Sequence, residues 1–436
     1  MQHHPPRLRV LAVALAASLA ALAAPAHADE LSDVKAQVDL LLKRVAELEK
    51  KPAAMAATVP ANVVTGGATK GSFKLPGSDT SVTIGGYVKL DAVFSDKSAG
   101  VGSTGDMELE PGTIAVGPNA GANERNQVKL HARQSRFFLK TSTPTGYGDL
   151  GTYLEYDLFG AAGNESVSNS NGLRVRHAYG TLGGLLAGQT WTTFSDPATY
   201  AETLDFGGAV GVIFARQAQV RWTQKFASGQ WSVALENPES VVSLPDGSSF
   251  RADDDRVPDI AANIHFDTAR GNYSIAAIAR QVRVDSASAP NSRSDKWGGG
   301  LGVNGVIPFA GKDDARVSAY FGNALGRYTV GYFTDGVLDT AGRVQLANQW
   351  TVSAAYRHFW SENVRSTLAL SALKSSNPAG SAGGLNRSAE SAHLNVIWSP
   401  VPQTNLGVEY IFARREIENG QSGRLNRVQA SAQYSF

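Results

Sequence analysis

The chain has 436 residues, of which 42% are hydrophobic and 45 are glycine, and its 40 basic and 39 acidic residues leave a formal net charge of +1. So balanced a charge argues against a nucleic acid partner, which requires a concentrated basic surface. The sequence contains no cysteine, which excludes disulfides and thiolate metal sites from the fold.

Residues 1–28 have the pattern of a secretory signal peptide. Arg7 and Arg9 form a positive n-region, residues 10–24 form an apolar stretch, and Ala26-His27-Ala28 is a cleavage site of the A-x-A type. The alternative is a membrane anchor, but the apolar stretch is shorter than the roughly 20 residues that a spanning helix requires. Cleavage would remove two basic residues and bring the net charge to about −1.

Residues 29–51 are predicted to form a short coiled-coil helix. Its apolar residues alternate in spacing between three and four until Pro52 ends the pattern, and they are Leu31, Val34, Val38, Leu41, Val45 and Leu48. An isolated helix of this length is marginal in water, so it needs a partner. One interpretation is self-association of identical chains, and the other is packing on its own domain or on another periplasmic component. Residues 52–79 are rich in Ala, Gly, Pro, Ser and Thr, which predicts a linker.

From residue 80 to residue 436 the chain is predicted to be all-β, because apolar and polar residues alternate with the period of a strand. The segments with this period are 80–94, 126–142, 149–160, 172–182, 185–191, 213–225, 229–236, 257–267, 272–284, 295–307, 315–324, 346–359, 363–374, 387–399, 403–415 and 424–436. The last one shows the pattern most clearly and ends on Phe436, as the final strand of bacterial outer-membrane barrels does. An apolar outer face and a polar inner face predict a 16-stranded antiparallel transmembrane β-barrel.

Connection length supports the same architecture, because long and short connections alternate along the chain. Long connections such as 95–125 and 192–212 follow the odd-numbered segments, while short turns such as 183–184 follow the even-numbered ones. Outer-membrane barrels have short periplasmic turns and longer external loops. Both termini then lie on the turn side, which places the N-terminal helix in the periplasm and the barrel among lipid and lipopolysaccharide. A soluble barrel or sandwich, the alternative, gives no such rule for loop length.

The polar phase of the strands is expected to line an aqueous lumen, since a barrel of sixteen strands is wide enough for water. The lumen-facing charges are predicted to be Lys89, Arg136, Lys140, Arg174, Arg176, Arg221, Arg316, Arg357 and Arg427 against Asp91, Glu155, Asp157, Glu236, Asp259 and Glu409. Basic groups are in excess, and rings of Arg or Lys select anions. The alternative is that the arginines only pair with Glu155 and Asp157 across strands. His177 falls on the outward phase, next to Arg176.

Several stretches resemble the DcaP-like family of trimeric outer-membrane porins. The stretches are Ile84–Ala92, Ala132–Phe137, Lys140–Thr145, Tyr153–Glu155, Leu173–Gly180 and Leu186–Trp191. The resemblance implies a trimeric sixteen-stranded channel with a coiled-coil extension and a basic constriction for small anions such as dicarboxylates. The basic positions that match are Arg136, Arg174 and Arg176 and, more loosely, Arg216 and Arg221, which have opposite phases on one strand. Phe138 replaces an expected smaller residue, and the external loops match no family pattern.

The loop at about 192–212 is predicted to narrow the channel, as the third external loop does in porins. It is less polar than an exposed loop, and its acids Asp196, Glu202 and Asp205 are expected to face the arginine wall. The alternative is an ordinary surface loop.

An enzymatic role is not expected, and no cofactor or metal is predicted. The histidines are scattered without the spacing of a metalloprotease motif. Asp253, Asp254 and Asp255 could hold Ca²⁺, although a solvated loop tip explains them better. The second hypothesis for function is a plugged barrel with an adhesin, structural or lipase-type role.

Overall fold

The computed structural model of the chain describes residues 35–45, 47, 63–97, 106–118, 125–161, 167–169, 171–252, 255–285, 289, 292–329 and 332–436. Two compact units divide the chain, Met1–Thr65 and Gly66–Phe436. In the first unit residues 35–45 and 47 are helical, within the predicted coiled-coil segment, and apolar side chains such as Leu41 are exposed. The signal peptide lies outside the described residues, and the pairing of the helix with other chains stays a prediction. Among the described residues no helix is long and apolar enough to cross a membrane.

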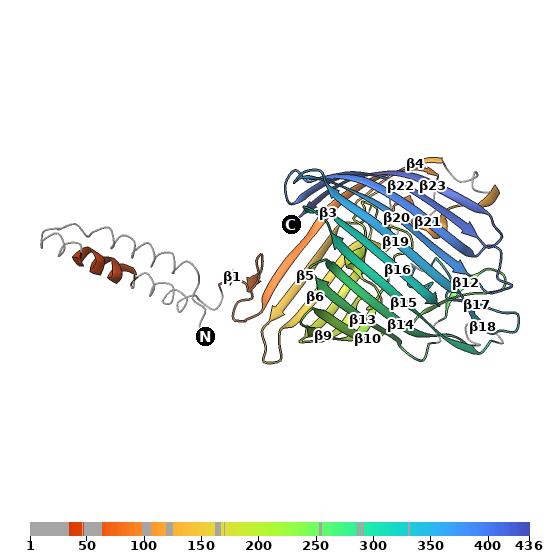
Figure 1. The fold of residues 1–436 in the computed structure, drawn as a ribbon, viewed down its shortest axis with the longest axis horizontal. Coiled ribbons are helices and arrows are strands. Elements are labelled where there is room, and N and C mark those ends of the chain that lie inside the picture. The colour runs from red at the N-terminus through yellow and green to blue at the C-terminus, as the bar shows by residue number, and fades with distance from the viewer. Residues whose placement is uncertain are drawn as a thin grey trace. The chain divides into compact units, whose positions relative to one another are not determined.

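The second unit contains a closed antiparallel barrel (Figure 1). Its strands are β3 (Ser81–Lys97), β4 (Arg125–His131), β5 (Arg136–Thr143), β6 (Leu150–Ala161), β7 (Gly172–Leu182), β8 (Leu185–Trp191), β9 (Arg216–Phe226), β10 (Gly229–Glu236), β13 (Asp259–Thr268), β14 (Gly271–Val284), β15 (Ser294–Pro308), β16 (Asp314–Asn323), β19 (Asn348–Phe359), β20 (Val364–Ser376), β21 (Asn386–Trp398), β22 (Thr404–Ile417) and β23 (Ser422–Ser435). Two short strands precede them, β1 (Thr65–Gly66) and β2 (Phe73–Lys74).

Each barrel strand pairs with its neighbours in chain order, and β23 pairs with β3 to close the ring. The predicted segment 126–142 is interrupted, because β4 and β5 both pair with β3 and residues 132–135 separate them. If β4 and β5 are counted as one interrupted strand, the barrel has sixteen strands, which confirms the predicted fold. The ring of paired strands thus returns to its first strand, as a sheet in lipid requires.

Solvent exposure alternates along the strands, with apolar side chains exposed and polar side chains buried, the reverse of the pattern in a soluble protein. On β23, Val428 and Tyr434 are exposed on the outer surface, whereas Arg427, Gln429 and Ser431 are buried inside. Apolar side chains therefore face outward and polar side chains face the interior, as a barrel in lipid requires.

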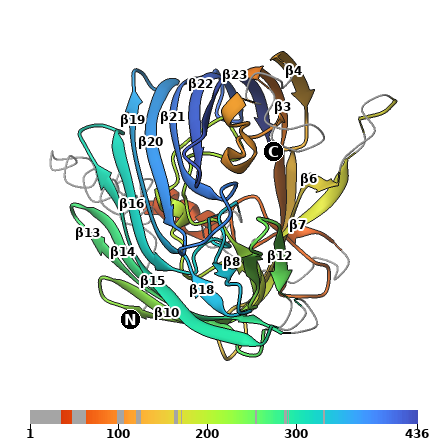
Figure 2. The ribbon, with the colours of Figure 1, turned by 90° about the vertical axis from the view of Figure 1, so that its right-hand side faces the viewer.

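The connections at one end of the barrel fold into and over its interior (Figure 2). A second sheet, in the order β12-β11-β17-β18, is formed by β11 (Ser240–Ser243), β12 (Ser249–Ala252), β17 (Gly336–Leu338) and β18 (Val344–Leu346). These strands lie in connections that the sequence pattern assigns to external loops. Two 3₁₀ turns, η2 (Pro111–Thr113) and η4 (Pro197–Thr199), belong to the connections after β3 and β8.

Three connections pack against apolar positions of the inner wall. Leu109, Val210 and Phe333, one from each connection, belong to a buried cluster with Leu373 of β20 and Ile411 of β22. The connections after β3, β8 and β16 therefore meet inside the barrel. Burial of this apolar surface holds them there, and they divide the interior that a solute would have to cross.

Candidate solute pathway

A cluster of arginines and carboxylates lines one side of the interior on β5, β6 and β7. Arg174 binds Asp157 through two hydrogen bonds, with Nε–Oδ1 at 3.0 Å and Nη2–Oδ2 at 2.8 Å. Arg176 bridges the two acids, with Nε–Oε1 of Glu155 at 2.6 Å and Nη1–Oδ2 of Asp157 at 3.0 Å. Arg136 Nη1 lies 3.5 Å from Glu155 Oε1. The five predicted residues therefore lie together, and Arg174 with Asp157 forms the planar two-bond pair that guanidinium groups favour.

A β-bulge turns two consecutive side chains of β7 inward. Glu155 pairs with His177 and Tyr156 pairs with Val175, so Arg176 has no partner in the register between them. Arg176 and His177 are consequently both buried. The prediction that His177 faces outward is wrong, because strict alternation fails where one strand carries an extra residue.

Arg216 joins the cluster from the start of β9. By alternation it shares the outward phase of Val220 and Trp222, yet its Cζ lies 5.2 Å from the ring centroids of both Trp191 and Phe214. It is near enough to the other arginines of the cluster for electrostatic interaction. No carboxylate of the described residues forms an ion pair with Arg216, and its Nη1 is buried without a hydrogen bond to them. The rings contribute cation–π contacts in place of a counter-ion.

Arg221, the fifth predicted arginine, is separate from this cluster. It lies further along β9, where the titratable groups that influence it are Glu236 and Tyr179. Alternation predicts that Arg221, and not Arg216, faces the lumen, and the resemblance matches both arginines loosely. Contacts with Trp191 and Phe214, at the two ends of the connection between β8 and β9, bring Arg216 into the cluster instead.

The acids of the predicted constriction loop lie in three different places. Asp196 caps η4, accepting from Ala198 N at 3.1 Å, and binds Ser274 Oγ at 2.6 Å. Glu202 binds Arg365 Nη2 at 2.6 Å on β20. Asp196 and Glu202 therefore contact other walls of the barrel, contrary to the expectation that they face the arginine cluster.

The pKa values of these loop acids follow from their partners. Burial would raise the pKa of Glu202, but hydrogen bonds and charge from Arg365 and Arg357 outweigh it and lower the pKa. Burial raises the pKa of Asp205, with opposition from Arg427. Asp205 accepts hydrogen bonds from the backbone N–H groups of Leu109 and Gly208, both at 2.9 Å. Asp205 thereby joins the connection after β3 to the predicted constriction loop.

Two carboxylates of the inner wall hold the predicted constriction loop by its backbone. Glu236 accepts from Thr193 N at 2.6 Å, and Glu409 accepts from Leu204 N at 2.6 Å. Lys89 Nζ donates to Leu204 O at 2.6 Å. The sequence identified Glu236, Glu409 and Lys89 as lumen charges, but their role as anchors depends on a loop that is distant in sequence.

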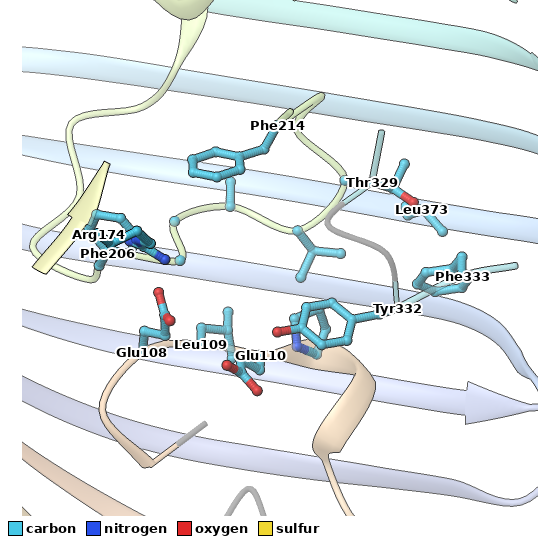
Figure 3. A pocket seen from close by; sticks show the side chains of 16 residues that line it. Glu108, Leu109, Glu110, Arg174, Phe206, Phe214, Thr329, Tyr332, Phe333 and Leu373 are labelled. Carbon is cyan, nitrogen blue, oxygen red and sulfur yellow. The ribbon is translucent and has the colours of Figure 1, made fainter. Parts of the chain in front are cut away.

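Two cavities lie on either side of a short segment of the loop, residues 206–209. The outer cavity, of about 210 Å³, is lined by this segment, by residues 108–111 and by Thr329, Tyr332 and Phe333 (Figure 3). The inner cavity, of about 260 Å³, includes Arg136 and Arg176 in its lining. The ring of Phe206 stacks on Phe159 at 4.7 Å and lies 5.3 Å from Arg174 Cζ. A solute that crosses the barrel through these cavities passes the arginine cluster.

The described residues bring no three His, Asp or Glu side chains together as a metal site. Asp253 and Asp254, from the acidic loop considered for Ca²⁺, lie outside the described residues.

Comparisons with known proteins agree with this architecture. The family model described as DcaP outer membrane protein matches residues 18–436. The crystal structure of the outer membrane channel DcaP of Acinetobacter baumannii is 25% identical and superposes with a TM-score of 0.72, covering 85% of this chain and 100% of that one. No curated protein matches the chain by sequence.

More distant structures share the fold. The anion-selective porin from Comamonas acidovorans is 13% identical, with a TM-score of 0.53 and coverage of 82% of this chain and 100% of that one. The trimer form of OmpT from Vibrio cholerae is 12% identical, with a TM-score of 0.52 and coverage of 82% and 99%.

Proposed function

Since this chain belongs to the DcaP outer membrane protein family, we propose that it is a passive channel with a preference for small anions such as dicarboxylates. The family and the likeness to the DcaP channel support an outer-membrane channel role. A barrel of this size that retains polar cavities along its interior is suited to diffusion of small hydrophilic solutes.

The arginine cluster is the observation that carries the anion preference. Among the described residues the four arginines Arg136, Arg174, Arg176 and Arg216 have ion pairs with only two carboxylates, Glu155 and Asp157, which leaves an excess of two positive charges. Asp205 also borders the inner cavity, but it forms an ion pair with Arg427 at 3.7 Å. It therefore does not neutralise the arginine cluster.

The same geometry suits carboxylates as solutes. Guanidinium groups present planar pairs of donors and keep their charge at every physiological pH. In a water-filled pore each such contact is worth roughly 1 kcal/mol or less. Contacts of that strength favour anions without trapping them, which conduction requires.

We propose further that the chain assembles as a homotrimer in the outer membrane, with residues 29–51 in the periplasm after removal of residues 1–28. The trimer form of OmpT, which shares the fold, supports a trimer. The exposed apolar side chains of the helix, Leu41 and Val45 among them, support contacts between helices.

Reversal potentials across a planar bilayer test the function directly. The purified protein in a KCl gradient should show steady open steps and a reversal potential displaced toward that of chloride, and gels of unheated samples should show an oligomer. A cation-selective reversal potential would contradict the anion preference. Electrical silence would favour the plugged barrel with an adhesin, structural or lipase-type role.

A further inference from the structure

The outer cavity contains a carboxylate without a hydrogen bond or ion pair to a described residue. Glu108, on the connection after β3, makes no hydrogen bond or ion pair with a described residue, and its carboxylate points toward the side of the cavity where Arg174 and Phe206 lie (Figure 3). The neighbouring carboxylates are occupied. Glu110 is hydrogen-bonded to Tyr332, and Asp205 accepts backbone N–H groups. Glu108 is therefore available to a solute.

Arg174 contributes a cationic group to the same cavity. Its Nε and Nη2 bind Asp157, which leaves Nη1 without a hydrogen bond to the described residues. The side chain retains 31% of its exposure. One guanidinium nitrogen is thus accessible to a carboxylate on a solute, and the pairing with Asp157 holds it in position.

Apolar side chains form much of the remaining wall. Phe206 and Phe214 lie on one side, and Phe333 and Leu373 lie on another (Figure 3). The cavity of about 210 Å³ therefore combines one free acid, one accessible base and an apolar surface. Charged groups of both signs recognise a solute that carries both signs, and the apolar wall accommodates a small hydrocarbon body.

We propose that the outer cavity is a selectivity site for small zwitterions with an apolar body, such as aliphatic α-amino acids. The ammonium group contacts Glu108, and the carboxylate contacts Arg174. Glu108 is then a specificity-determining residue for the channel, acting together with Arg174 at the edge of the arginine cluster. This inference rests on the proposed channel function, to which it adds a second class of solute.

Protonation of Glu108 couples this site to pH. Burial, Asp205 and Glu110 raise the pKa of Glu108 to about 8, against the opposing charges of Arg174 and Arg133. A raised pKa means that the empty site binds a proton near neutral pH, and an arriving ammonium group competes with that proton. Zwitterion uptake should therefore increase as the pH rises through about 8.

Liposome swelling with L-valine and with N-acetyl-L-valine, which lacks the ammonium group, tests the site. For the wild type at about pH 8.5, the rate for valine relative to its acetyl derivative should exceed that of Glu108→Gln by about threefold, the effect of one partly screened ionic contact. Asp246→Asn, which removes one exposed carboxylate from the loop between β11 and β12, should match the wild type. An equal ratio in Glu108→Gln and wild type would overturn the proposal.

The wild type provides a measurement that does not depend on how the variant folds. Its ratio of valine to N-acetyl-valine rates should rise by about twofold between pH 6.5 and 8.5, and a flat profile would also overturn the proposal. The KCl reversal potential separates this result from the proposed function. Wild-type anion selectivity with an unresponsive valine ratio refutes only the zwitterion site, whereas loss of anion selectivity in the wild type refutes the proposed function.

Discussion

Replacing Arg216 with Gln removes a positive charge from the arginine cluster without leaving a carboxylate unpaired. Arg216 has no ion pair among the described residues, and it contacts the rings of Trp191 and Phe214. The loss of these two cation–π contacts costs roughly 0.5–1 kcal/mol each. Arg216→Gln should therefore fold and assemble as the wild type does, which heat-modifiable migration on gels can verify.

The expected effect on selectivity follows from Coulomb's law. At about 8 Å in water one unit charge changes the energy of a monovalent ion by about 0.5 kcal/mol. One Debye length of screening at physiological salt reduces this to about 0.2 kcal/mol. The change has opposite signs for chloride and potassium, so the two contributions add. The permeability ratio of chloride to potassium should therefore fall about twofold.

Reversal potentials in a KCl gradient measure this ratio. Arg216→Lys keeps the charge and should keep the wild-type ratio, and Arg251→Gln removes an exposed charge from β12 and should do the same. Two results would refute the reasoning. One is an unchanged ratio in Arg216→Gln, and the other is an equal loss in Arg216→Lys, which would assign the effect to the shape of the side chain.

Three further predictions concern the cluster and the loop. Changing Arg174 and Arg176 together to Ser cancels the excess of two charges, so the chloride to potassium ratio should fall about fourfold, and a ratio that stays the same would show that both only pair strands. Glu409→Gln removes the negative charge from the carboxylate that accepts the backbone N–H of Leu204, and hydrogen bonds to a charged group contribute roughly 1.5–3 kcal/mol. The variant should show larger fluctuations in open-channel current. Fluctuations equal to those of the wild type would show that other contacts hold the loop. The lowered pKa of Glu202 means that its stabilising pairs persist above the ordinary value of 4.5 and are lost as the pH falls through the folded pKa. Current noise should accordingly rise only below that ordinary value, and noise that begins at neutral pH would contradict this.

The sequence by itself determined that the chain forms a barrel, how many strands the barrel has and which face of each strand is apolar. Each strand faces lipid on its outer side and water on its inner side, so every second residue must be apolar. The alternation of residues along a strand is therefore enough to show this contrast. Val428 and Gln429 can be assigned to opposite faces from the sequence alone, and the exposed fractions agree. The cluster of Glu155, Asp157 and Arg174 was predictable for the same reason, since their strands are neighbours in the chain.

The tertiary structure alone decided which groups line the route of a solute. The bulge at Arg176 turns His177 inward, and alternation contains no signal for an extra residue. Glu202 forms an ion pair with Arg365 on β20, and Glu108 lines the same cavity as Arg174. Both acids belong to connections that meet inside the barrel. Such contacts join segments far apart in the chain, and packing across the lumen sets them. The alternation of residues within a strand does not specify which loop packs against which strands of the barrel.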